Sequence, residues 1–405
     1  MFRFREIPHN LFIEKFLISL GLFSIFLSYF LYQIGHGILS MRLIFASGIL
    51  CWIILSINHP RFYKDFSKKL TFSICALIFL LAINQFLYLN WLNFFGIYYD
   101  PIGTGLLLSI LGIGILSSYQ TKSFITHLIY FFSVICALTA IPIELNNYGY
   151  LGRVGGIFNQ SDVLAEVLSL GILIGLQLFS KSTKPYQRVL LYLSETCLTI
   201  GLYLSGTRFV LITLILLVLL SVYFLRKQLY KILPLIISLI AIYTFLNFSI
   251  SFPRISQLSG YAQGFSYRLE LQTYAAKRLN HLPFFGVGVG NISNILDCRG
   301  MKSIPALNDT CGDNFVFSSS HNIFIDKLLD FGFIFGLIYG LITLYTISKG
   351  YKTVEEDNFI YYLVFISIVL YFFSNVSLPE VEIIFWIMLF GIHNKQLNNG
   401  LRSIN

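Results

Sequence analysis

The run FVLITLILLVLLSVYFL at residues 209–225 contains no charged side chain. It is long enough to cross a bilayer as one helix, for which about 17–25 apolar residues suffice. The same criterion, applied along the whole chain, gives twelve candidate spans. They lie near residues 11–33, 36–57, 70–90, 102–118, 124–144, 163–180, 189–206, 209–225, 232–249, 322–347, 358–376 and 381–393. The sequence therefore predicts an all-α polytopic membrane protein with about 12 transmembrane helices.

The composition of the chain supports this class. Of its 405 residues, 56% are hydrophobic and only 12% are charged, about half the charged fraction of a soluble domain. The net charge of +9 comes from bases scattered between the spans, so we expect membrane lipids as partners and no nucleic acid. Most of the 28 Lys and Arg residues fall on one side if both termini are cytoplasmic, which is the orientation that the positive-inside rule predicts.

One connection is much longer than the others. Residues 251–320 are polar and glycine-rich, and a loop of this length in a compact protein is usually functional. We expect a single membrane domain, residues 1–405, that includes this loop as a partly helical segment on the outer, non-cytoplasmic face. Within the loop, residues 267–280 have helical spacing. Leu271 and Ala275 mark one face of that helix, and Arg268 and Gln272 lie one turn apart on another.

Two further features of the loop have more than one interpretation. Cys298 and Cys311 could form a disulfide under oxidising conditions, although their spacing does not show whether they come close enough. The run GVGVG lacks the spacing of a nucleotide-binding loop. Its glycines Gly286 and Gly288 instead favour a close approach of the backbone to a span or to an anionic ligand. No zinc or calcium pattern accompanies the acidic residues of the loop, so we expect no metal cofactor.

The candidate chemical groups lie at span ends on the outer side. Arg153 and Arg208 lie where a cation near hydrocarbon is unfavourable unless an anion compensates, and the planar guanidinium suits a pyrophosphate. The alternative is a snorkelling arginine at a helix end. His321 joins the long loop to the next span and could take a proton from a hydroxyl. Its alternative is a bystander beside a helix that Ser320 or Asn322 caps.

Residues inside the predicted spans leave two roles open, pairing between helices and contact with substrate. The ionisable ones are Glu195, Asp326, Lys327 and Asp330. Small residues in the tenth span predict a close-packing helix face, because they recur every four residues. They are Gly332, Gly336 and Gly340.

Four ordered stretches of the chain carry a resemblance to a known family. They are GRVGGIFNQSDVLAE (152–166), SGTRF (205–209), YRLELQTYAAKRLNHLPFFGVGVGN (267–291) and SSHNIFIDKLLDFGFIFGL (319–337). Together they resemble the O-antigen ligase and polymerase superfamily of bacterial membrane glycosyltransferases. Two positions depart from the family's pattern: Ser161 stands where the family often has Pro, and Asp162 where it often has Asn.

The resemblance implies an enzyme of the bacterial inner membrane whose active site faces the periplasm and whose donor is a glycan on undecaprenyl pyrophosphate. Arg208 and Arg268 would neutralise the pyrophosphate with help from Arg153. His321 would be the general base, and Asn322 would orient the acceptor hydroxyl. Other residues of these stretches are candidates for substrate binding: Asp162, Gln272, Gly286 and Gly288. The resemblance implies neither a metal nor another cofactor.

The acceptor remains open at this point. A ligase would join the glycan to lipid A–core, a polymerase would use a second lipid-linked glycan, and an O-oligosaccharyltransferase would use a protein hydroxyl. We take the ligase as the first hypothesis. From another class, a transporter or flippase would move the glycan without making a bond, but the sequence has no internal repeat of the kind that many transporters show.

Overall fold

The computed structural model describes residues 11–33, 37–60, 62–87, 102–146, 161–224, 229–249, 259–281, 284–288, 292, 296, 319–353, 359–373 and 379–394. Over these ranges the chain forms fourteen α-helices and no β-strand. The all-α class is therefore confirmed for this part of the molecule. Arg153, Cys298 and Cys311 lie outside the described residues, so the roles expected of them stay predictions.

The helices follow the predicted segments closely. The first half of the chain forms α1 (Leu11–Gln33), α2 (Gly37–Asn58), α3 (Lys68–Leu87), α5 (Ile102–Ser117), α6 (Lys122–Asn146) and α7 (Ser161–Lys181). The second half forms α8 (Pro185–Ser205), α9 (Arg208–Phe224), α10 (Leu229–Ser249), α12 (Ser259–Arg278), α16 (Ile323–Phe331), α17 (Phe333–Thr353), α18 (Phe359–Phe372) and α19 (Pro379–His393). Short 3₁₀ turns lie at Phe62–Lys64 and Leu279–His281.

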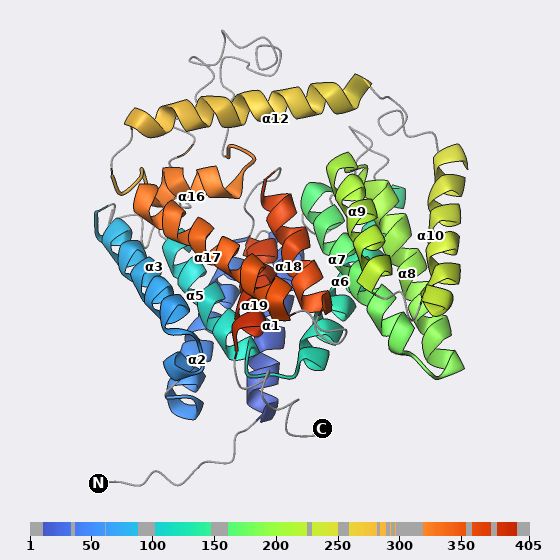
Figure 1. Ribbon diagram of the computed structural model, residues 1–405, viewed down its shortest axis with the longest axis horizontal. Coiled ribbons are helices and arrows are strands. Elements are labelled where there is room, and N and C mark those ends of the chain that lie inside the picture. Colours follow the sequence, from blue (N-terminus) through green and yellow to red (C-terminus); the bar gives the residue numbers. More distant parts are fainter. Residues whose placement is uncertain are drawn as a thin grey trace.

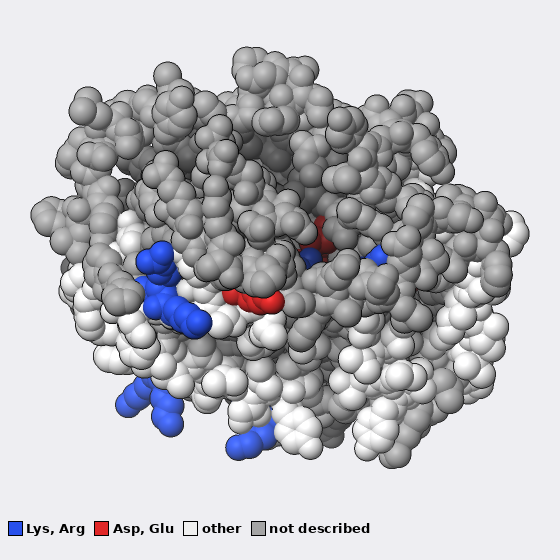
Figure 2. Space-filling view, turned by 90° about the horizontal axis from the view of Figure 1, so that it is seen from above, with Lys and Arg blue, Asp and Glu red and all other residues white. Residues whose placement is uncertain are grey.

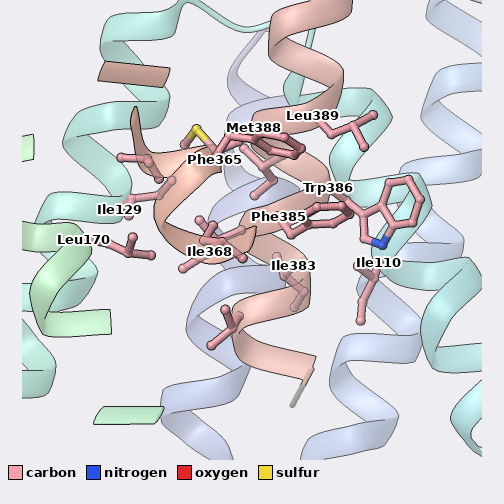
Figure 3. Packing of buried hydrophobic residues seen from close by; sticks show 14 of the residues in the cluster. Ile110, Ile129, Leu170, Phe365, Ile368, Ile383, Phe385, Trp386, Met388 and Leu389 are labelled. Carbon is pink, nitrogen blue, oxygen red and sulfur yellow. The ribbon is translucent and has the colours of Figure 1, made fainter. Parts of the chain in front are cut away.

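The centre of the bundle is built around α19. Every described side chain of this helix is buried, as expected for a helix that is apolar on all sides. Phe385 and Trp386 lie between Phe365 of α18 and Ile110 of α5 (Figure 3). α7 is buried almost as completely and packs against α6, α8 and α18. These two helices form the core that the others surround.

Large apolar side chains on the surrounding helices point away from this core. Leu190 on α8, Leu216 on α9 and Ile237 on α10 are each more than half exposed. Water would make such a surface unfavourable, whereas hydrocarbon would not. In the described part of the chain, three helices are long and apolar enough to cross a membrane, and six more are apolar but shorter. The chain therefore has the character of a membrane protein, and the count of 12 spans stays a prediction.

α12 is the helix that was expected inside the long loop, and it lies across one end of the bundle, over α16 and toward α9 and α10 (Figure 1). It begins at Ser259, several residues before the predicted start. Leu271 and Ala275 are fully buried, which confirms the predicted inner face. Arg268 and Gln272 lie on a different face of α12. From there Arg268 contacts Asp162 of α7, and Gln272 contacts His321 and Phe373.

The predicted tenth span is not one helix, because the chain breaks between α16 and α17 at Gly332. Gly332 has φ 88, and a Cβ there would collide with the carbonyl oxygen of Phe284. A Cβ on Gly336 would meet Leu328, whereas a Cβ on Gly340 would have nothing within 4 Å. The predicted close-packing glycine face is therefore wrong, since the three glycines lie in three different environments.

Candidate functional site

The site begins where α7 starts and α8 ends. Gly206 ends α8 in the left-handed conformation, with φ 61, which glycine adopts without strain. The chain then turns sharply, and the Thr207 hydroxyl donates a hydrogen bond to Oδ1 of Asp162 at 3.0 Å. Arg208 follows as the first residue of α9. The SGTR motif is thus a tight turn that contacts the motif around Asp162.

α12 reaches the same carboxylate from above. Nη2 of Arg268 lies 3.2 Å from Oδ2 of Asp162, and each side chain is 22% exposed. One carboxylate therefore joins α7, the α8–α9 turn and α12. Such a bond uses one of the five N–H donors of a guanidinium, so it is compatible with a second, phosphate ligand on Arg268. Because a carboxylate repels an anion, this geometry favours Asp162 as the residue that orients Arg268.

The next turn of α12 contacts the residue expected to be the base. Nε2 of Gln272 donates to the carbonyl oxygens of His321 at 3.1 Å and Phe373 at 3.0 Å. Gln272 therefore ties α12 to the turn before α16 and to the end of α18. Oδ1 of Asn322 accepts from the backbone N–H groups of Phe324 and Ile325. The helix-capping interpretation of Asn322 is confirmed, and substrate contacts of Gln272 and Asn322 stay predictions.

The imidazole of His321 lies in a largely buried and charged environment. Its pKa is lowered to about 4, chiefly because burial disfavours the charged ring and also because Arg268 is close, while Asp162 opposes this change. At neutral pH the ring is therefore uncharged and able to accept a proton. Arg268 contacts Asp162 and Gln272 contacts His321 one turn further along α12, so these residues gather at the same end of the bundle.

The glycine run packs against the far end of α16. The N–H groups of Val287 and Gly288 donate to the carbonyl oxygens of Leu329 and Asp330, at 2.9 and 3.0 Å. Gly286 and Gly288 both have positive φ. The close approach of this run to a predicted span is therefore confirmed, and contact of Gly286 and Gly288 with a ligand stays a prediction.

The glycine run and the end of α16 form a junction, and Asn84, which contacts both parts, was not predicted from the sequence. Asn84 of α3 donates to the carbonyl oxygens of Phe285 and Asp330, at 2.7 and 3.1 Å. A buried asparagine in an otherwise apolar predicted span was the available signal, because such a group needs polar partners. Phe285 and Asp330 are more than 200 positions from Asn84 in the chain, so these partners of Asn84 could not be predicted from local sequence patterns.

Lys327 and Asp326, two ionisable residues in the predicted tenth span, contact neighbouring polar groups. Nζ of Lys327 lies 3.1 Å from a carboxylate oxygen of Glu382 on α19, and both side chains are buried. The Asp326 carboxylate accepts hydrogen bonds from Ser319 and Ser320. Glu195 is fully buried against Gly175 of α7. The pairing interpretation is therefore confirmed for Lys327.

Seen from the α12 end, a few acidic and basic side chains are visible near the centre of the molecule (Figure 2). The contacts of Asp162, Arg268 and His321 form a charged site at one end of an apolar helical bundle. This fold and site define the class as a helical membrane protein with a polar site that faces away from the core of the bundle.

Residues 196–340 match the family model described as O-antigen ligase. The chain thus carries a domain of the O-antigen ligase and polymerase superfamily, which confirms the resemblance of its motifs. At the level of this family it is a membrane glycosyltransferase of the ligase or polymerase type. The matched range includes Arg208, Arg268 and His321, whereas Asp162 precedes it. No curated protein matches the chain.

Proposed function

We propose that the protein transfers a glycan from undecaprenyl pyrophosphate to a hydroxyl of lipid A–core, on the periplasmic face of the bacterial inner membrane. The observation that carries this proposal is the convergence of Arg268, Asp162 and His321 from α12, α7 and the turn before α16. A cation suited to phosphate and a neutral imidazole then share one site. The family match supports the same reaction class.

The reaction divides between two kinds of group. The acceptor oxygen attacks the anomeric carbon of the donor, and the bond from that carbon to the pyrophosphate oxygen breaks with both electrons staying on the pyrophosphate. The acceptor proton passes to His321. Arg268 and Arg208 neutralise the growing charge on the leaving group, and fixed cations favour the transition state most where water is excluded. No redox step or nucleotide is needed for the balance.

The neutral state of His321 suits this role. An imidazole must be unprotonated before it takes a proton, and the low pKa of His321 keeps the ring unprotonated throughout the neutral range. Once the pyrophosphate is bound, its negative charge stabilises the imidazolium. The base therefore gains affinity for the proton when the donor is in place.

The test uses a strain that lacks the endogenous gene and is complemented with the wild type, His321→Ala or Arg208→Ala. We expect both variants to lose the surface glycan at wild-type protein levels. Accumulation of lipid-linked polymer, with bare lipid A–core, supports a ligase. If a single repeat unit still caps the core, the protein is a polymerase instead. Full glycan display by both variants would refute the enzyme and favour a transporter.

A further inference from the structure

The backbone of the residue proposed as base is in an unusual conformation. His321 has φ 58 and, among the residues that the structure describes, is the one non-glycine residue with positive φ. The left-handed region is unfavourable for a residue with a side chain, because its Cβ comes too close to the following carbonyl oxygen. Such a conformation persists only when surrounding contacts impose it. The contacts that impose this backbone conformation on His321 therefore also limit the directions that its imidazole can take.

Asp326, in the first turn of α16, supplies the charged contacts to this turn. Its Oδ2 accepts from the hydroxyl of Ser319 at 2.6 Å, and its Oδ1 accepts from the backbone N–H of Ser320 at 2.8 Å. Oγ of Ser319 in turn accepts from the backbone N–H of His321 at 3.0 Å. A continuous chain of contacts therefore runs from the Asp326 carboxylate to the backbone of His321.

The groups in this chain are shielded from water. Ser319, Ser320 and Asp326 are all at most 5% exposed, so a hydrogen bond lost there is not replaced by one to solvent. On the other side of the turn, Gln272 holds the His321 carbonyl. The turn is thus fixed at its N–H side through Asp326 and at its carbonyl side through α12. The imidazole of His321 is near enough to Arg268 and Asp162 for both to act on it electrostatically.

We propose that Asp326 is a positioning residue, which sets the direction of the His321 imidazole by fixing the Ser319–His321 turn in its left-handed conformation. This inference rests on the proposed function, in which His321 is the base. A purely structural alternative exists, because a carboxylate in the first turn stabilises the start of a helix. The two roles differ in what they predict for catalysis per folded molecule.

The experiment uses the full-length protein in detergent, with lipid-linked glycan and lipid A–core extracted from the knockout strain as substrates. The variants are Asp326→Ala, Asp326→Asn and Ser319→Ala. We expect Asp326→Ala to lower kcat about ten- to hundredfold, since a small displacement of a reacting group has effects of this size, with KM for the donor nearly unchanged. Asp326→Asn keeps an acceptor for the Ser320 N–H, so it should recover part of the activity.

The pH profile provides a readout that a structural role would not move. The groups facing the imidazole are Arg268 from α12 and Asp162 from α7, and Asp326 contacts the backbone of its turn. Once the turn relaxes, the ring gains water, and the acidic limb of kcat/KM should move up from about pH 4 toward the ordinary value of about 6.5. Ser319→Ala should move it in the same direction, and this variant leaves the carboxylate in place should Asp326→Ala fail to fold.

The matched control removes the neighbouring buried pair, with Lys327→Met and Glu382→Met combined. It changes the same helix without leaving a buried charge unpaired, so it should alter thermal stability but leave the acidic limb in place. If Asp326→Ala keeps both wild-type kcat and the wild-type limb while His321→Ala is inactive, the positioning role is wrong and the proposed function stands. If His321→Ala is itself active, the proposed function is wrong.

Discussion

Two polar clusters lie at opposite ends of the bundle, and each combines a carboxylate with an imidazole. The α1 cluster comprises Glu14, Asn58, His59, Tyr119 and Gln120. The α12 cluster comprises Asp162, Thr207, Arg268, Gln272 and His321. In Figure 1, α1 begins near the N-terminal end of the chain, whereas α12 lies across the other end. Similar residue types thus occur in two places with different surroundings.

In the α1 cluster the carboxylate is saturated with partners. Glu14 accepts from Asn58 and Gln120, each at 2.7 Å, and lies 3.3 Å from Nε2 of His59. The His59 ring is stacked on Tyr119 with centroids 3.8 Å apart. Every contact is between side chains and joins the ends of α1, α2 and α5. This arrangement stabilises the packing of those helices.

In the α12 cluster Asp162 contacts Thr207 and Arg268 through side chains, whereas Gln272 contacts His321 through its backbone carbonyl. Gln272 binds the His321 carbonyl and not its ring, and Asp162 and Arg268 each keep 22% of their side chains exposed. The difference teaches that an imidazole beside a carboxylate does not by itself indicate catalysis. What distinguishes the α12 cluster is that the backbone of His321, the proposed base, is held on both its N–H and its carbonyl side.

The largest effect should separate the two histidines. His321→Ala removes the proposed base, so product formation per folded molecule should fall at least about a hundredfold. His59→Ala should lower the melting temperature and leave activity per folded molecule nearly unchanged. Both are measured by release of undecaprenyl pyrophosphate from purified protein, alongside thermal unfolding. Equal loss of activity in both variants would contradict the distinction between the clusters.

The next effect concerns Gly332, which ends α16 where it meets the backbone of Phe284. Gly332→Ala forces a side chain into a positive φ and against the Phe284 carbonyl, so we expect a loss of about 1–3 kcal/mol in the free energy of unfolding. Gly340→Ala is the matched control, because its Cβ would meet nothing within 4 Å, and it should change stability by less than about 0.5 kcal/mol. Thermal unfolding in detergent measures both, and equal shifts would show that the junction is not constrained.

Substitution of the Glu14 carboxylate should affect stability, whereas substitution of the Asp162 carboxylate should affect binding of the donor. Glu14→Gln places an amide among buried donors and should lower the free energy of unfolding by about 1–2 kcal/mol. Asp162→Asn removes only a partly exposed ion pair, which contributes at most about 1 kcal/mol. Its effect should instead appear as a rise of up to about fivefold in KM for the donor, because Arg268 loses the charge that orients it. An unchanged KM would show that Arg268 needs no such partner.

The smallest expected effect is on the pH dependence of kcat/KM, which should be nearly flat between about pH 5.5 and 7.5 because the pKa of His321 is low. With the pKa of His321 at about 4, the ring is neutral at both pH 5.5 and pH 7.5, so kcat/KM should differ by less than about twofold between them. A histidine with the ordinary pKa of about 6.5 would give roughly a tenfold fall at pH 5.5. Steady-state kinetics at these two values distinguish the cases, and the steep fall would show that the ring is exposed in the working enzyme.

The positions of the helices were predictable because hydrophobic runs are local signals. Each of the twelve predicted segments contains a helix, and the buried face of α12 follows from the spacing of Leu271 and Ala275. The break at Gly332 was not predicted, since the four-residue spacing of the glycines also fits a continuous helix. Only the meeting of Gly332 with the Phe284 carbonyl, from a distant part of the chain, reveals why a glycine is there.

The members of the site were predictable in part. Arg268 and His321 followed from the motifs, and they do share a site. Substrate binding by Asp162 and Gln272 stays a prediction, and the contacts that the structure adds are with Arg268, Thr207 and backbone carbonyls. A sequence shows which polar residues lie near span ends. It does not show which of them meet, because contacts across more than 100 positions leave no periodic pattern.

The spacing of Arg268 and Gln272 on α12 has a mechanical consequence. Because the two lie one turn apart, any rigid shift of α12 carries the guanidinium and the anchor of the His321 carbonyl together. A shift of α12 would therefore disturb the Asp162 contact of Arg268 and the His321 contact of Gln272 at the same time. The helical rise between positions 268 and 272 sets the separation of the Arg268 and Gln272 backbones along α12.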